Sequence, residues 1–590
     1  MQQEAPFLQR RELVLYLMLA AAAGTYVVLR ALFVPLVHDE TTSFLAYAQP
    51  GTFLPFRSMW DANNHFLNSA CGWLGYSIGG LHLFALRWAS VAAFALYAWS
   101  AWRIGNRIGH RGVCWCLWCA LLFCPLVIEY FSLFRGYGPA LAFLLFALEA
   151  MTTYAVMHDG RSLWRALAAL ALANGFVLAL VPLWTIALVL LAVLAKAQRR
   201  HLAVLWVVGF VPLALVVGYS FLMSRYGLLY HGSTEGFVAV TVRSLALGVF
   251  GTGDPVVVSA MLAAVVGGLG LVTRRAVQER SLLSPSAVVA WLLVLEGIGR
   301  IAAAHIIGLN HASDRTAMHL LLLGILVVAF AADNVRTPWQ WRWCFALLLL
   351  PLPLRTLTMA NLEAMVLCPE QSIPAHFINY VEALEQDLGR PAVVATHRLA
   401  GHPWALQRRM GGGEGDVNAH SWPQGLSDVL ILPSVGLATV STGYAVADSA
   451  PGNQLYLLVR EPRLAAAVVS ESTFRLEPVT GDRLARIQLP AHVLREHDLF
   501  VELSGTLTSP ADPLDVQLII SVLDSAGQPV HGDLVFLNTR REDWNGEAWR
   551  TIRHVPRNPA AHKAFFFFRA PPAQPYALSN GRLVVRTARP

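Results

Sequence analysis

Two adjacent carboxylates, Asp39 and Glu40, follow the first long apolar stretch of the sequence, directly after His38. A carboxylate within hydrogen-bond reach of a hydroxyl group can take its proton and act as a general base. Acidic groups at the edge of an apolar region lose solvation and tend to persist there only with a task or a partner. An isolated Asp-Glu pair is more often a solvated loop feature, so the surrounding residues decide its meaning.

Three further polar clusters stand at boundaries of other apolar segments. They run from Asp61 to Asn68, from Glu129 to Gly138 and from His305 to Arg315, and they include Asn64, His65, Arg135, Tyr137 and His311. The guanidinium group of arginine suits phosphate, because its planar fork donates two hydrogen bonds and keeps its charge when desolvated. Arg135 and Arg315 are therefore candidates for binding a phosphate group.

The composition places most of these elements in a membrane. The 590 residues are 56% hydrophobic and 14% charged, whereas about a quarter of the residues of soluble domains are charged. Apolar stretches of about 18 to 25 residues recur, which is the length that crosses a ~30 Å hydrocarbon core as a helix. The net charge of +7 comes mostly from arginines scattered over short loops, so nucleic acid is not an expected partner.

Positive charge predicts the orientation, because loops that stay in the cytoplasm carry an excess of Lys and Arg. Basic turns at Arg10, Arg103, Arg161, Arg199 and Arg274 alternate with polar turns. About eleven spans are expected, at residues 13–34, 80–101, 113–130, 138–157, 164–179, 183–196, 203–222, 256–272, 285–304, 316–332 and 343–360. The N-terminus would then be cytoplasmic, and the chain beyond residue 360 would lie outside, in the periplasm if the membrane is a bacterial inner membrane.

The expected organisation is a transmembrane domain over 1–360 followed by two extracytoplasmic domains. Residues 361–460 combine the helical pattern of His376–Gly389 with short apolar runs at 391–396 and 428–434, which predicts a small α/β unit. Residues 461–590 alternate apolar runs and turn residues, which predicts a β-sandwich. The fold class is thus an α-helical polytopic membrane protein with a C-terminal α/β and β-sandwich portion.

Four segments together resemble the GT-C superfamily of membrane glycosyltransferases. They are the acidic pair after the first span, the NNHFLNS segment from Asn63, the SLFRGYGPAL segment from Ser132 and the DRTAMHLLL segment from Asp314. Within that superfamily the chain is most similar to bacterial relatives of protein O-mannosyltransferases and of the lipid A aminoarabinose transferase. The resemblance covers about residues 10–360 and does not include the tail.

The resemblance implies an inverting transfer of a sugar from a polyprenyl-phosphate carrier to an envelope acceptor on the outer face. Asp39 matches the catalytic acid of the family's first loop, with Glu40 beside it as helper or structural partner. Arg135 and Arg315 match the cations that bind the donor phosphate. The remaining candidates, which would contact sugar, acceptor or lipid, are His38, Asn64, His65, Tyr137 and His311.

No metal site is predicted. Family members often carry an aromatic or apolar residue before the acidic pair, and His38 stands there instead, where it could shift the pKa of Asp39 or join His65 or His311 around a divalent cation. Histidines at membrane interfaces more often form hydrogen bonds. The acidic-x-acidic motif of the family's metal-dependent branch does not occur in this first loop, so no cofactor is expected.

Two other functions remain open. A non-catalytic protein that binds or exports lipid-linked glycans would place ionisable groups near the middle of the membrane; Glu296 and Arg300 are such a pair, one helical turn apart, and are expected to neutralise each other. Alternatively the tail binds carbohydrate through Trp404, Trp422, Trp544 or Trp549, although burial in a core is the commoner fate of such residues.

Overall fold

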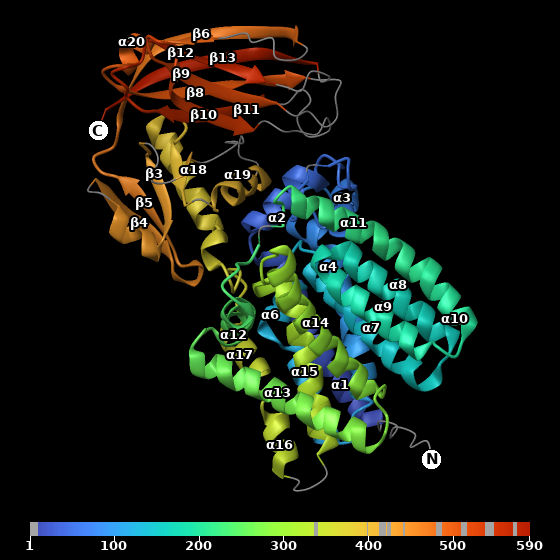
Figure 1. Cartoon of the computed structure of the whole chain (residues 1–590). Helices are drawn as coiled ribbons and strands as arrows, with labels where there is room; N and C mark the ends of the chain where they lie inside the picture. Colours follow the sequence, from blue (N-terminus) through green and yellow to red (C-terminus); the bar gives the residue numbers. More distant parts are fainter. Residues whose placement is uncertain are drawn as a thin grey trace. The chain divides into compact units, whose positions relative to one another are not determined.

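A computed structural model describes most of the chain, in two compact units (Figure 1). The described residues are 10–58, 60–229, 231–335, 340–397, 399–411, 420–421, 426–440, 443–479, 487–508, 516–536, 548–569 and 575–589. The first unit is helical and comprises the chain up to Leu32, Phe53–Ile78 and Phe84–Leu362. The second unit comprises Phe33–Thr52, Gly79–Leu83 and the chain from Glu363 onward. Each unit is described separately.

Seven helices of the first unit are long and apolar enough to cross a membrane. They are α1 (Arg10–Phe33), α4 (Leu83–Gly105), α7 (Tyr137–Met157), the continuous helix Arg199–Arg225, α13 (Pro255–Gln278), α14 (Pro285–Ile307) and Asp314–Asn334, which contains α15 (Met318–Asn334). Arg111–Leu122, Leu178–Leu194 and Val238–Phe250 are shorter apolar helices. The polytopic helical fold is thus confirmed, whereas the predicted number of eleven spans is not.

Prolines divide several of the expected spans. The 113–130 stretch forms α5 (Arg111–Leu122) and α6 (Pro125–Tyr130), with Pro125 at the first position of α6. Pro351 likewise separates α16 (Gln340–Leu347) from α17 (Pro351–Met359). Proline lacks the backbone N–H that a helix interior needs but is tolerated in a first turn. The spans expected at 164–179 and 183–196 correspond to two helices, α8 (Gly160–Phe176) and α9 (Val181–Leu194), joined by η2 (Leu178–Leu180).

The long first loop expected at 35–79 is partly helical. It contains α2 (His38–Ser43), η1 (Phe44–Ala48) and α3 (Phe66–Gly79). The loop expected at 223–255 likewise contains η4 (Val238–Val242) and α12 (Arg243–Phe250). These segments are too short to span a bilayer, so hydropathy alone does not distinguish them from loops.

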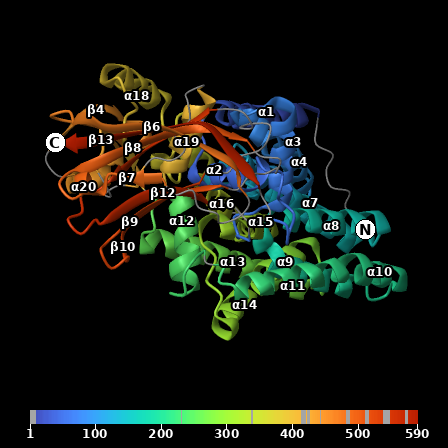
Figure 2. The same ribbon diagram turned by 90° about the horizontal axis from the view of Figure 1, so that it is seen from above.

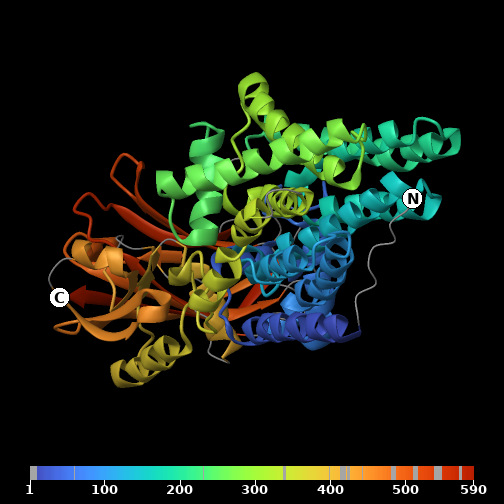
Figure 3. The ribbon, with the colours of Figure 1, turned by 90° about the horizontal axis from the view of Figure 1, so that it is seen from below.

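Helix α15 forms the centre of the helical unit, since nearly all its residues are buried. In Figures 2 and 3 the blue helix α1 and the green helices α13 and α14 lie on opposite flanks of this unit. Two buried carboxylates of this unit form ion pairs: Arg103 Nη2 donates to Glu149 Oε1 at 2.9 Å, and Arg300 Nε donates to Glu296 Oε1 at 2.6 Å. Such pairing lowers the cost of placing a charge away from water.

The second unit contains a small mixed sheet that two helices accompany. The sheet order is β2-β1-β3-β5-β4, with β1 (Val394–Thr396) parallel to β2 (His420–Ser421) and β3 (Val429–Pro433), and with β5 (Leu455–Arg460) antiparallel to β3 and β4 (Tyr444–Ala450). Helix α18 (Ala375–Leu388) and helix α19 (Gly401–Met410) contribute Phe377 and Trp404 to its core. Because Trp404 is fully buried, it is not a sugar-stacking residue; Trp422, Trp544 and the side chain of Trp549 lie outside the described part.

Two antiparallel four-stranded sheets complete this unit (Figure 1). One has the order β10-β9-β12-β7 and the other β11-β8-β13-β6, formed by β6 (Ala465–Val479), β7 (Ile487–Leu489), β8 (Asp498–Thr508), β9 (Gln517–Leu523), β10 (Pro529–Phe536), β11 (Ala548–Val555), β12 (Lys563–Arg569) and β13 (Tyr576–Arg589). Alternate residues such as Val501, Leu518 and Phe566 form their shared core. The strand-rich tail was predicted, whereas the domain boundaries at 360 and 460 stay predictions.

Candidate functional site

Arg135 is held in the turn between α6 and α7. Its side chain is 2% exposed, and Nη1 donates to Asn63 Oδ1 at 2.5 Å. The guanidinium carbon lies 5.7 Å from the centre of the Tyr137 ring, which is a favourable cation–π distance. Arg135 is therefore fixed in orientation before any ligand binds.

Two glycines allow this turn to pack closely. A Cβ atom on Gly136 would lie 2.3 Å from Phe176 O, and one on Gly138 would lie 2.5 Å from Tyr130 O. These separations are far below van der Waals contact with backbone atoms, so neither position has room for a side chain. Close packing thus explains the glycines of the Arg-Gly-Tyr-Gly sequence, independently of any role of Arg135 and Tyr137.

Tyr130 lies at the centre of the candidate site. Its hydroxyl group is buried and has no hydrogen-bond partner among the described residues. The charges of Arg315, Glu129 and Arg135 act on it, and its ring centre lies 5.2 Å from that of Tyr137, which in turn lies 5.0 Å from the His65 ring. The structure thus brings together four of the predicted residues, namely His65, Arg135, Tyr137 and Arg315.

Arg315, whose charge acts on Tyr130, lies in a short turn before α15. It lies in η5 (Asp314–Ala317), whose start is closed because Thr316 Oγ1 accepts from Ser313 N at 3.1 Å. The preceding Asp314 has φ +47°, a left-handed conformation that Asp adopts more readily than most residues, and its N–H donates to Ser244 Oγ at 2.8 Å. Two independent contacts therefore fix the backbone that carries Arg315.

A buried ion pair that was not predicted from the sequence supports the same turn. Arg30 of α1 and Glu129 of α6 are 1% and 2% exposed, and Arg30 Nη2 lies 2.9 Å from Glu129 Oε1. Arg30 Nη1 also donates to Asn361 O at 2.7 Å. An arginine inside an otherwise apolar span indicates a functional site. By this criterion both Arg30 and the equally buried Arg87 could have been identified from the sequence.

Asn64 and His311 have local contacts of their own. The Asn64 amide donates to Ser58 Oγ at 2.9 Å and to Phe53 O at 3.2 Å, so it holds the loop before α3. His311 N donates to Ser233 O at 2.9 Å. Burial, followed by the charge of His305, lowers the pKa of His311, so the ring is neutral at neutral pH. A role for either residue in binding substrate stays a prediction.

The acidic pair lies on α2, in the second unit. Glu40 is 0% exposed, and its Oε2 accepts from Val37 N at 3.2 Å, which closes the start of the helix. Asp39, the next residue toward the N-terminus, is partly exposed. The Glu40 carboxylate thus caps the helix, whereas a role of Asp39 or Glu40 in proton transfer stays a prediction.

The histidine before the acidic pair packs against another aromatic ring. His38 stacks on His402, with ring centres 5.3 Å apart. The described residues include no group of three or more His, Cys, Asp or Glu side chains that could hold a metal ion.

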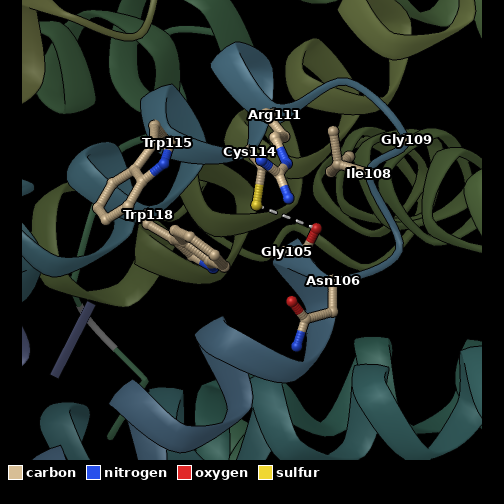
Figure 4. A pocket seen from close by; sticks show the side chains of 8 residues that line it. All are labelled: Gly105, Asn106, Ile108, Gly109, Arg111, Cys114, Trp115 and Trp118. Carbon is tan, nitrogen blue, oxygen red and sulfur yellow. Dashed lines mark hydrogen bonds between the residues drawn. The ribbon is translucent and has the colours of Figure 1, made fainter. Parts of the chain in front are cut away.

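A small pocket lies at the C-terminal end of α4, beside α5. It holds about 10 Å³ and is lined by residues that include Asn106, Arg111, Cys114 and Trp118 (Figure 4). Cys114 Sγ donates to Gly105 O at 3.3 Å across it. That volume is at the lower limit for one water molecule, so this pocket cannot hold a sugar or a phosphate.

Comparison with known proteins gives structural likenesses only. No family model matches the chain, and no curated protein matches it by sequence. Among solved structures, the chain is similar to ArnT from Cupriavidus metallidurans bound to undecaprenyl phosphate, with 13% identity and a TM-score of 0.45 over 76% of this chain and 97% of that one. It is also similar to the arabinosyltransferase EmbB from Mycobacterium smegmatis, with 11% identity and a TM-score of 0.35 over 97% of this chain and 64% of that one.

Proposed function

We propose that the protein is an inverting glycosyltransferase that moves a sugar from a polyprenyl-phosphate carrier to an envelope acceptor. The observation that carries the proposal is the cluster around Tyr130, where two arginines act on a buried hydroxyl group that has no hydrogen-bond partner among the described residues. A phosphate oxygen can accept from a hydroxyl and from guanidinium groups together. The cluster therefore suits the phosphate of such a donor, next to aromatic rings that suit a sugar.

In the proposed reaction, a hydroxyl oxygen of the acceptor attacks the anomeric carbon of the sugar. The bond from this carbon to the phosphate oxygen breaks, and the configuration at the carbon is inverted. Asp39 takes the proton of the attacking hydroxyl. Arg315 and Arg135 stabilise the negative charge that develops on the departing polyprenyl phosphate.

The other predicted residues have supporting roles in this scheme. Tyr137 and His65 lie in one aromatic group with Tyr130, where they would contact the sugar, and His38, Asn64 and His311 would contact the acceptor or support the loops around it. Glu40 maintains the turn that carries Asp39. The acceptor would be a lipid, a glycan or a protein of the envelope.

The alternative, a non-catalytic protein that binds or exports lipid-linked glycans, has weaker support. Its main indication was the ionisable pair within one apolar segment, and Glu296 is 2.6 Å from Arg300 and 3.0 Å from His319. Arg300 also donates to Ala179 O at 2.7 Å. These groups are thus engaged in joining helices, which is a sufficient reason for their presence without a transport path.

The proposal is tested with purified protein and a panel of polyprenyl-phosphate sugars. We expect transfer of sugar to a hydroxyl acceptor, release of polyprenyl phosphate in equal amount and an inverted anomeric configuration in the product. Donor binding is measured in parallel by calorimetry. Binding without transfer across the panel would contradict the enzymatic proposal and favour the glycan-binding protein.

The proposed location is a bacterial inner membrane, with the N-terminus in the cytoplasm and the tail in the periplasm. The alternation of basic and polar turns is its basis. We expect a reporter enzyme that is active only outside the cytoplasm to be active when fused after residue 365, and inactive when fused near Arg107 or Arg275. An inactive fusion after residue 365, with the protein present in the membrane, would contradict this orientation.

A further inference from the structure

The helix that carries the acidic pair is too short to be stable alone. Helix α2 has six residues, and isolated helices need more than about twelve residues to be even marginally stable in water. Within the segment, Thr41 N donates to Val37 O at 3.0 Å, and Glu40 caps the start. The orientation of Asp39 therefore depends on what packs against this turn.

Two side chains from the C-terminal part of the second unit contact His38, the first residue of α2. The backbone N–H of His38 donates to Gln371 Oε1 at 3.2 Å. The His38 ring stacks on His402 of α19, with ring centres 5.3 Å apart and an angle of 23° between the planes. Figures 1 and 2 show α19 beside α2. His38 is thus held through both its backbone and its side chain.

Both of these groups are themselves firmly anchored. His397 Nε2 lies 2.9 Å from Glu370 O, which fixes the 3-10 turn η6 (Pro369–Gln371) beside the small sheet. In α19, Trp404 is fully buried in the core, and Arg408 Nη2 donates to Glu385 Oε2 at 2.8 Å. The contacts on α2 are therefore made by rigid elements, which is what precise positioning requires.

His402 acts through its shape rather than its charge. Burial, followed by the charge of His38, lowers its pKa to about 4, so the ring is neutral at neutral pH. Its Nδ1 is buried and has no hydrogen-bond partner among the described residues. Another flat ring of similar size can therefore replace it, whereas a small side chain would remove the support for His38.

We infer that His402 and Gln371 are positioning residues for Asp39, so that the C-terminal portion is part of the catalytic apparatus. This inference rests on the proposed role of Asp39 as the base. Neither residue touches the reacting atoms; both contact His38, which precedes Asp39 in the first turn of α2. A displacement of a catalytic group by about 1 Å can cost up to ~10² in rate, so loss of either contact has a measurable effect.

The test combines kinetics with hydrogen–deuterium exchange on His402→Ala, Gln371→Ala and His402→Phe. We expect His402→Ala and Gln371→Ala to lower kcat for sugar transfer by about 10- to 100-fold, to leave KM for the donor within about twofold, and to speed exchange in residues 37–48. His402→Phe should restore most of the kcat and most of the protection from exchange. His376→Ala is the matched control, because His376 is 52% exposed on α18 and pairs with Asp448; it should behave like wild type.

The outcomes separate this inference from the proposed function. Wild-type kcat in both alanine variants would overturn it, whether or not exchange changes. Reduced kcat with unchanged exchange in residues 37–48 would also overturn it, because the effect would not act through α2. The exchange measurement needs no donor, so faster exchange in a protein whose wild type transfers no sugar would contradict the proposed function and leave the support of α2 intact.

Discussion

Asp39→Asn is expected to lower kcat for sugar transfer by ~10² to 10⁴. Asparagine keeps the shape of the side chain and can still accept a hydrogen bond, but it cannot take up the proton of the acceptor hydroxyl. Donor affinity should stay within about twofold, because the base does not contact the phosphate. Turnover and donor binding on the same purified samples check both statements.

Glu40→Gln is the matched control for this experiment. Glu40 accepts from Val37 N and caps α2, and the glutamine Oε1 can accept the same hydrogen bond. Loss of part of this cap is expected to cost about 1 kcal/mol of stability, and its effect on kcat should be smaller than that of Asp39→Asn. A larger effect at Glu40 would move the base to that residue, and full transfer by Asp39→Asn would exclude Asp39.

Arg315→Ala is expected to lower kcat/KM for the polyprenyl-phosphate donor. The loss corresponds to about 2 to 4 kcal/mol of transition-state stabilisation. The physical reason is the loss of one preorganised charge beside Tyr130, in a turn whose backbone is fixed by Ser244 and Thr316. Arg315→Lys should restore only part of the loss, because an ammonium group cannot bridge two phosphate oxygens as a guanidinium does.

Arg225→Ala serves as the control for the loss of one positive charge. Arg225 lies exposed at the end of α11 (Val211–Arg225), with its guanidinium 5.9 Å from the Phe221 ring. We expect this variant to match wild type in kcat/KM at the same ionic strength. If Arg315→Ala also matched wild type, the cation that binds the donor phosphate would have to be another residue.

The sequence was most informative where local pattern alone forms an element. The span predicted at 138–157 is α7 (Tyr137–Met157), and that predicted at 285–304 lies within α14 (Pro285–Ile307). The helix expected from His376 is α18, and the apolar runs at 391–396 and 428–434 contain β1 and β3. These elements follow from the length and periodicity of apolar segments, which depend only on residues close together in the sequence.

The candidate site was predictable only in part. Arg135 and Arg315 were identified because each stands at the boundary of an apolar segment and because a guanidinium group suits phosphate. Tyr130 was overlooked as its centre, because a tyrosine near the end of an apolar segment is indistinguishable in sequence from an interfacial aromatic residue. The pairing of Arg30 with Glu129 joins residues 99 positions apart, and local sequence carries no trace of such a contact.

The sequence by itself thus determined the membrane class, the strand-rich tail and the types of residue available for chemistry, since these depend on composition and local periodicity. Only the tertiary structure decided which of these residues meet. It assigned α2 to the same compact unit as the tail, stacked His38 on a residue 364 positions away and engaged Glu40 in a cap. Each of these outcomes depends on packing between distant segments, whose geometry arises from the whole core rather than from any one stretch of the chain.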